Sequence, residues 1–173
     1  MTQVGSVNQI LRVDHAGERG AISIYRAQLL VSKALNRRCV PALQEMLEHE
    51  YRHHQAFESL LKARGVGHCY AITLWALGGF VLGTITALLG ERAIWVCTSA
   101  IENTVNEHLE HQVAFLASAD PEALAAVESI RFDEQAHEEH AVNNGGASGG
   151  LYRILHGIVR GVTSFAIWLS TKL

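Results

Sequence analysis

Two short motifs in this 173-residue chain combine a carboxylate and an imidazole at the spacing of one helical turn. They are Glu50-x-x-His53 and Glu134-x-x-His137, and on a helix each would place its two side chains on one face. A single Glu-x-x-His is most often a solvated pair on a helix surface. Two copies in one chain, each with a further glutamate ahead of it, favour metal binding instead.

The glutamates ahead of the motifs, Glu18 and Glu102, complete a repeat. Each lies 32 residues before its motif, and all three positions recur at an offset of 84 residues (18 to 102, 50 to 134, 53 to 137). One Glu from each of two helices and a Glu-x-x-His from each of two others form the ligand set of two-metal sites inside ferritin-like bundles. The repeat therefore predicts a two-metal site in a bundle with an internal pseudo-two-fold relation. The six expected ligands are Glu18, Glu50, His53, Glu102, Glu134 and His137.

The chemistry of this ligand set indicates redox metals. Oxygen-rich ligation without thiolates suits iron or manganese better than zinc. Four carboxylates neutralise most of the charge of two divalent ions, and two imidazoles leave positions open for dioxygen. We expect Glu50 and Glu134 to bridge the metals, with Glu18 and Glu102 as terminal ligands and one His on each metal. The opposite bridging assignment stays open at this stage.

Other polar residues near the motifs are candidates for supporting roles. A histidine that binds a metal needs a hydrogen-bond partner for its second nitrogen. Asp14, one turn before Glu18, and Asp133, next to Glu134, are candidates, and His108 could bond within the site or near a substrate. Each of the three could equally be an ordinary polar residue. Four further histidines are interpreted as surface residues or alternative donors: His49, His54, His111 and His140.

The fold class is predicted to be all-α. No segment alternates like a half-buried strand, and the two prolines, Pro41 and Pro121, both suit helix starts. A single ferritin-like four-helix bundle with two additional apolar helices is expected over 1–173. Its parts are a first bundle half (1–64), an apolar arm (71–90), a second half (91–144), a glycine-rich flexible link (145–150) and an amphipathic C-terminal helix (151–173).

Two segments are unusually apolar. Residues 71–90 contain no charge, and at about 1.5 Å per residue a helix of that length could cross about 30 Å of hydrocarbon. A buried bundle helix, a transmembrane span and an interfacial arm that touches lipid are the three alternatives. The last helix, 151–172, mixes apolar residues with sparse basic ones. It suits either a membrane surface or a cap on the bundle.

Composition excludes several other classes. Hydrophobic residues make up 49% of the chain and charged residues 18%, which is too apolar for disorder. With a net charge of −3 and no basic stripe, no nucleic-acid partner is expected. Three cysteines without C-x-x-C spacing indicate neither a disulfide framework nor a zinc site. The first ten residues resemble neither a secretory signal nor a transit segment.

The residues around the expected ligands resemble a known family, the demethoxyubiquinone hydroxylases. The most specific match is Val-Asp-His-Ala-Gly-Glu, which ends at Glu18. The family often has Tyr where this chain has Leu109 and Trp168. A substrate or electron-transfer role attached to those two tyrosine rings is therefore not carried over to this chain. The remaining matches span nearly the whole chain: Glu50-x-x-His53, Leu74-Trp75, Gly79-Phe80, Gly83, 86–90, Cys97-Thr98, Glu102, His108, Gln112, Asp133-Glu134-x-x-His137 and 166–170.

The resemblance implies a ferritin-like enzyme with two iron ions per chain that hydroxylates a polyprenylated methoxy-benzoquinol ring with dioxygen. The six ligands carry over position by position. It also implies a peripheral membrane protein on the cytoplasmic face of the bacterial inner membrane, or on the matrix face of the mitochondrial one. The reductant would be NADH or the quinol itself. A lipid-binding accessory protein and a homo-oligomer are further expected partners.

Two other functions fit the same ligands. A rubrerythrin-like di-iron oxidase or peroxidase would act on a small soluble oxidant and would not need the uncharged arm. A non-catalytic ferritin-like iron-binding protein would need a soluble, cage-forming surface, which the apolar last helix opposes. A fourth possibility is a membrane-associated helical scaffold without metal. A measurement of the iron content would distinguish it from the functions that use the iron site.

Overall fold

The computed structural model describes residues 6–147 and 149–173, and every regular element within them is helical. The predicted all-α class is confirmed, and the helices form a ferritin-like bundle. The expected apolar arm, 71–90, forms the helix Ile72–Leu89, and the expected last helix, 151–172, forms the helix Tyr152–Ser170. In chain order the elements are α1 (Val7–Ala34), α2 (Val40–Ala63), α3 (Ile72–Leu89), α4 (Glu91–Ala119), α5 (Pro121–Ala141), a π-helical turn η1 (Val142–Gly146) and α6 (Tyr152–Ser170).

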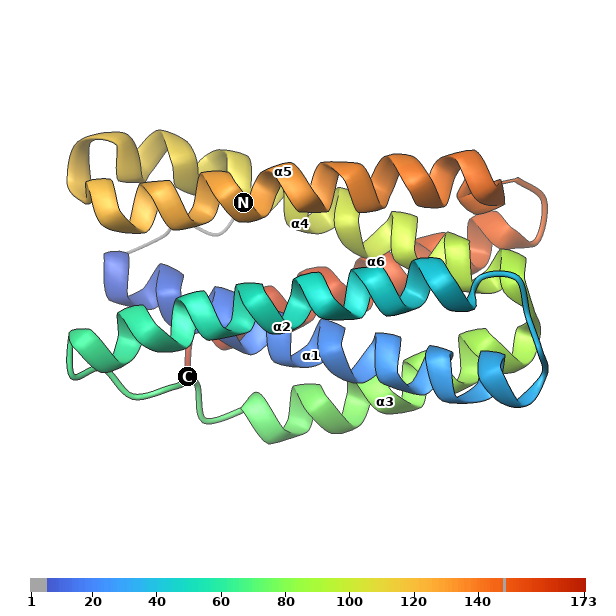
Figure 1. Ribbon diagram of the computed structural model, residues 1–173. Coiled ribbons are helices and arrows are strands. Elements are labelled where there is room, and N and C mark those ends of the chain that lie inside the picture. The colour runs from blue at the N-terminus through green and yellow to red at the C-terminus, as the bar shows by residue number, and fades with distance from the viewer. Residues whose placement is uncertain (1–5, 148) are drawn as a thin grey trace.

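The helices are arranged as two similar halves. Four long helices, α1, α2, α4 and α5, form the bundle, and α3 and α6 lie outside it (Figure 1). In the first half α1 packs against α2 and α3, and in the second half α4 packs against α5 and α6. Each half is thus a long helix flanked by a Glu-x-x-His helix and an apolar helix, in the same chain order. This arrangement is the pseudo-two-fold relation that the sequence repeat predicts.

Glycines allow α3 to lie very close to α1. A Cβ atom added at Gly79 would lie 2.5 Å from the carbonyl oxygen of Gly20, and one added at Gly83 would collide with the carbonyl oxygen of Ile24. Side chains at these positions would push the two backbones apart. The glycines therefore fix α3 onto the bundle along one narrow edge.

The rest of α3 is exposed. Only Gly79, Gly83, Thr86 and Ala87 are buried, while most of its large apolar side chains are not. By length and composition α3 is the one described helix that could cross a membrane, and most of it is not buried. Of the three alternatives for this segment, the buried bundle helix is wrong. Helix α6 is similarly open, with only Val159 and Ser170 buried.

The described start of the link between α5 and α6 packs against the bundle. The π-helical turn η1, which includes Gly145 and Gly146, continues directly from α5. Gly146 is buried, and a Cβ atom there would lie 2.6 Å from the carbonyl oxygens of both Ala141 and Trp95. Its own carbonyl accepts a 2.8 Å hydrogen bond from Ser99. Glycine is needed here because the chain passes directly against α4.

Candidate metal centre

The six expected ligands lie in the middle of the bundle, between two apolar clusters. One cluster includes Ile10, Leu11 and Phe57, and the other includes Leu43 and Ile94. All six side chains are buried, although burying a charged group is costly unless it is paired or bound to a metal. Six such groups between two apolar clusters indicate a functional site rather than a structural core. They are Glu18, Glu50, His53, Glu102, Glu134 and His137.

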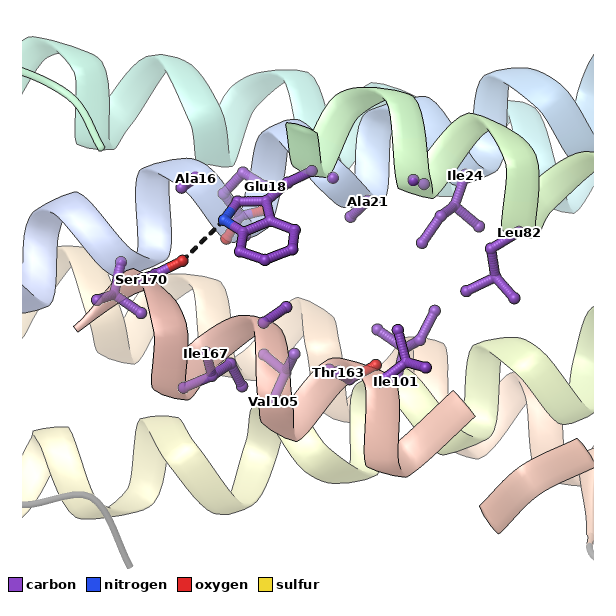
Figure 2. A pocket seen from close by; sticks show the side chains of 18 of the residues that line it. Ala16, Glu18, Ala21, Ile24, Leu82, Ile101, Val105, Thr163, Ile167 and Ser170 are labelled. Carbon is purple, nitrogen blue, oxygen red and sulfur yellow. Dashed lines mark hydrogen bonds between the residues drawn. The ribbon is translucent and has the colours of Figure 1, made fainter. Parts of the chain in front are cut away.

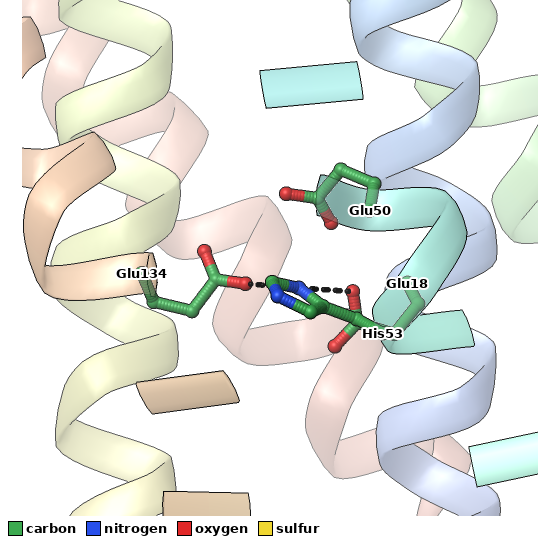
Figure 3. Close-up of side chains that lie close together, drawn as sticks. All are labelled: Glu18, Glu50, His53 and Glu134. Atoms are coloured by element: carbon green, nitrogen blue, oxygen red, sulfur yellow. Dashed lines mark ion pairs between the residues drawn. The ribbon is translucent and has the colours of Figure 1, made fainter. Parts of the chain in front are cut away.

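The ligand atoms form two groups that share two glutamates. In each group the four atoms lie within 4.8 Å of one another. Glu50 and Glu134 belong to both groups, which is the arrangement expected of bridging carboxylates. The first group is completed by Glu18 and His53, and the second by Glu102 and His137. Figure 3 shows the first group, with His53 lying between Glu134 and Glu18.

Both histidines direct the same nitrogen at the carboxylates. Nδ1 of His53 lies 3.0 Å from Glu134 Oε1 and 3.7 Å from Glu18 Oε2. Nδ1 of His137 lies 3.3 Å from Glu134 Oε2 and 3.5 Å from Glu50 Oε1. Neither Nδ1 atom makes a hydrogen bond of acceptable geometry, and the same holds for Glu50 Oε1 and Glu134 Oε2. Buried donors and acceptors left unmatched in this way fit a metal-binding cluster.

The cluster contains more carboxylates than basic side chains, so it needs additional positive charge or protons. Burial, together with Glu134, raises the pKa of Glu50 and that of Glu102 well above the usual range. For Glu134 burial acts in the same direction, but His137 and His53 outweigh it and lower the pKa to about 2. Burial opposes protonation of His53, yet Glu134 and Glu18 raise its pKa to about 11. Protons or metal cations must therefore balance these carboxylates.

Three residues contact the candidate ligands directly. Asp133 Oδ2 lies 3.0 Å from Nε2 of His53, where a residue that supports this histidine would lie. Tyr25 donates a 2.6 Å hydrogen bond to Glu102 Oε1, and His49 Nδ1 lies 3.2 Å from Nε2 of His137. Tyr25 is not among the residues that the sequence predicts for the site, and His49 is predicted only as a surface residue or an alternative donor. The 84-residue offset could have identified His49, because it relates this position to Asp133.

The other two candidates, Asp14 and His108, contact neither ligand histidine. Asp14 Oδ1 accepts a 2.7 Å hydrogen bond from Gln112, and His108 Nε2 lies 3.8 Å from the same oxygen. Burial is the main cause that raises the pKa of Asp14 and lowers that of His108 to about 4. Burial therefore favours the uncharged form of each side chain.

A cavity of about 460 Å³ leads to the cluster. Its mainly apolar walls come from α1, α3, α4 and α6. The four glutamates of the cluster, two of them from α2 and α5, line its inner end together with Asp14 and His108. Figure 2 shows the cavity between α3 and α6, with a dashed line from an indole nitrogen to Ser170. This line is the 2.8 Å hydrogen bond that Trp75 donates to Ser170 Oγ, which joins the two outer helices. Such a volume suits an organic molecule rather than a small ion.

Comparison with known proteins identifies the family. The profile described as "Ubiquinone biosynthesis protein COQ7" matches residues 5–170. The chain is 35% identical to the 3-demethoxyubiquinol 3-hydroxylase of Rhodospirillum rubrum, over 96% of this chain and 78% of that protein. It is also 35% identical to the mitochondrial NADPH-dependent 3-demethoxyubiquinone 3-hydroxylase of Mus musculus, with the same coverage. The 5-demethoxyubiquinone hydroxylase of Saccharomyces cerevisiae is 27% identical, over 99% of this chain and 80% of its own length. The chain therefore belongs to the COQ7 family of ubiquinone biosynthesis proteins.

Proposed function

We propose that this protein is a di-iron monooxygenase that hydroxylates a demethoxyubiquinol with dioxygen in ubiquinone biosynthesis. The family and the names of its relatives support this activity. The observation that carries the proposal is structural: two four-ligand groups that share Glu50 and Glu134 open into a largely apolar cavity. Metal-binding chemistry and room for an apolar substrate thus occur at the same place.

Each ligand group would hold one iron ion. Glu18 and His53 would serve one ion and Glu102 and His137 the other, with Glu50 and Glu134 shared. Bound iron would supply the binding and activation of dioxygen. The donor set fits iron, because it consists of carboxylates and imidazoles without a thiolate.

The protein's own residues would position the quinol ring. The apolar walls of the cavity exclude water and favour a substrate with an isoprenoid tail. Asp14 and His108 offer hydrogen bonds to ring oxygens in their uncharged forms, so they would orient the ring without attracting counter-ions. The electrons would come from NADH or from the quinol itself.

The outer helices would bring the site to a membrane surface. The exposed apolar side chains of α3 and α6 border the two sides of the cavity, so a lipid substrate could enter between these helices. We infer a peripheral protein on the cytoplasmic face of a bacterial inner membrane, or on the matrix face of the mitochondrial one. A lipid-binding accessory protein would deliver substrate to the same opening.

The alternative functions explain less of the molecule. A rubrerythrin-like oxidase or peroxidase acting on a small oxidant needs no apolar cavity of about 460 Å³. An iron-storage protein needs neither that cavity nor the exposed apolar face of α3. Both would share the iron site, so the quinone substrate is the property to test.

The test is a lipid extraction from cells that lack the gene, complemented with wild type, Glu134→Ala or Glu139→Ala. Glu134 is buried and belongs to both ligand groups, whereas Glu139 is exposed on the same helix. We expect the demethoxy quinone to accumulate without the gene and with Glu134→Ala, and ubiquinone to return with wild type and Glu139→Ala. Normal ubiquinone in the deletion strain, or rescue by Glu134→Ala, would overturn the proposal.

A further inference from the structure

The residue directly before each Glu-x-x-His motif contacts the histidine of the other motif. These residues, His49 and Asp133, are related by the same 84-residue offset as the ligands. Asp133 Oδ2 lies 3.0 Å from Nε2 of His53, and His49 Nδ1 lies 3.2 Å from Nε2 of His137. Each half thus contacts the candidate ligand histidine of the other half, through α2 and α5. The two contacts are at equivalent positions, but one is made by a carboxylate and the other by an imidazole.

The orientation of the ligand histidines determines the direction of these hydrogen bonds. In both, Nδ1 faces the carboxylates, so a metal would bind at Nδ1 and the proton would stay on Nε2. The Nε2–H group of His53 then donates to a carboxylate, and that of His137 donates to the unprotonated Nδ1 of His49. Asp133 Oδ2 is 3.8 Å from His49 Nδ1, too far for a hydrogen bond, so His49 Nδ1 is not engaged by Asp133 and can accept from His137.

We propose that His49 is a positioning residue for His137, and that the two metal positions are unequal because Asp133 and His49 support their histidines differently. An anionic acceptor makes a stronger hydrogen bond than a neutral one and makes the ligand a better electron donor. The position at His53 therefore binds its metal more tightly and is occupied first. This inference rests on the proposed two-metal function and adds an order of binding and a role for His49.

The surroundings preserve this difference. Arg52 Nη2 lies 4.0 Å from Asp133 Oδ2, so a cationic group is close to this acceptor, and no arginine among the described residues forms an ion pair of this kind with His49. The ring centroids of His49 and His137 are 5.1 Å apart with planes tilted by 30°, so the two rings meet nearly edge to edge through their nitrogens. His49 and Asp133 are both only partly exposed, which protects both hydrogen bonds from full solvent competition.

The experiment is anaerobic loading of the purified protein with ⁵⁷Fe(II), followed by Mössbauer spectroscopy. At one equivalent the wild type should show one dominant quadrupole doublet, and at two equivalents two doublets of similar area. His49→Ala should weaken the second binding step by about 10- to 100-fold and change the second doublet, while the first step stays within about threefold. Asp133→Asn should weaken the first step and remove the preference at one equivalent.

Two further variants separate positioning from folding. His49→Gln offers a side-chain oxygen as acceptor and should restore most of the second step, whereas His111→Ala, an exposed histidine on α4, should behave as wild type. Unchanged iron binding in His49→Ala, or equal weakening of both steps without rescue by His49→Gln, would overturn this inference while leaving the two-metal function intact. Fewer than two irons in the wild type would instead overturn the proposed function, and this inference with it.

Discussion

The two halves of this molecule supply the same ligands in different surroundings. Glu18 and His53 recur as Glu102 and His137, and α3 recurs as α6. Glu102, in the second half, accepts a hydrogen bond from Tyr25 of the first half. The position related to Tyr25 by the repeat is Leu109, which has no hydroxyl group to donate to Glu18. The repeat thus preserves the candidate metal ligands and varies what surrounds them.

The outer helices differ in the same way. α3 is uncharged and held by glycines against the backbone of α1. α6 is held to α4 partly by polar contacts, because Arg160 bonds both carboxylate oxygens of Glu107 at 2.8 and 2.9 Å. An added side chain disrupts a contact between two closely packed backbones and lowers stability. Loss of an exposed ion pair lowers the free energy of unfolding by at most about 1 kcal/mol. The first half should therefore be the more sensitive to substitution of its outer helix.

The largest expected effect is that of a methyl group at the contact between α3 and α1. Gly83→Ala would place Cβ against the carbonyl oxygen of Ile24, so we expect the free energy of unfolding to fall by about 1–3 kcal/mol. Gly161 in α6 has no atom within 4 Å of such a Cβ, and Gly161→Ala should be neutral or stabilising by up to about 1 kcal/mol. Urea denaturation measures both, and similar effects of the two substitutions would contradict the comparison.

A second, smaller effect is expected at Tyr25. Tyr25→Phe removes the 2.6 Å hydrogen bond to Glu102 Oε1, and loss of such a supporting bond lowers metal affinity by about tenfold or more. The loss should fall on the Glu102 position and spare the Glu18 position, as resolved by stepwise anaerobic Fe(II) titration. Tyr51→Phe is the matched control, because Tyr51 is 46% exposed on α2. Equal weakening of both positions would show that Tyr25 does not distinguish the halves.

The sequence predicts the helices and the six side chains that the structure brings together, because the causes of both are local or periodic. Helix bounds follow from the prolines and from breaks in the apolar pattern. The six candidate ligands follow from the 84-residue repeat, which gives the two halves equivalent side chains at equivalent positions. The supporting contacts depend on side chains from different helices. Tyr25 and Glu102 form a hydrogen bond although they are 77 residues apart in the sequence, and no spacing within one helix predicts that contact.

Hydropathy likewise could not decide the environment of α3. Its composition suits a buried helix, a membrane span or an interfacial arm equally. The deciding feature is the narrow edge of Gly79 and Gly83, which binds α3 to α1 while leaving the other sides open. Gly-x-x-x-Gly in the sequence indicates only that some helix approaches closely, and the partner is known only from the fold.

The smallest expected effect concerns how the two Glu-x-x-His helices begin. Asp120 caps α5, accepting a 2.9 Å hydrogen bond from the Ala123 amide and pairing with Arg64, whereas Cys39 at the start of α2 makes no side-chain cap. Asp120→Ala should therefore lower the free energy of unfolding by about 1 kcal/mol at pH 7. Urea denaturation of the two proteins measures this difference.

The loss of stability caused by Asp120→Ala should also depend on pH, because the pKa of Asp120 is lower in the folded protein than in the unfolded chain. Arg64 and the Ala123 amide lower the pKa of Asp120 in the folded protein, so its contribution is complete above the unfolded pKa of about 4. The contribution is lost as the pH falls through the lower, folded pKa. The stability difference between wild type and Asp120→Ala should therefore shrink below about pH 4. Asp120→Asn keeps an oxygen acceptor but no titrating charge, so its difference from wild type should be smaller at pH 7 and should shrink over the same pH range. A constant difference for Asp120→Ala down to pH 3 would mean that α5, like α2, begins without help from a charged cap.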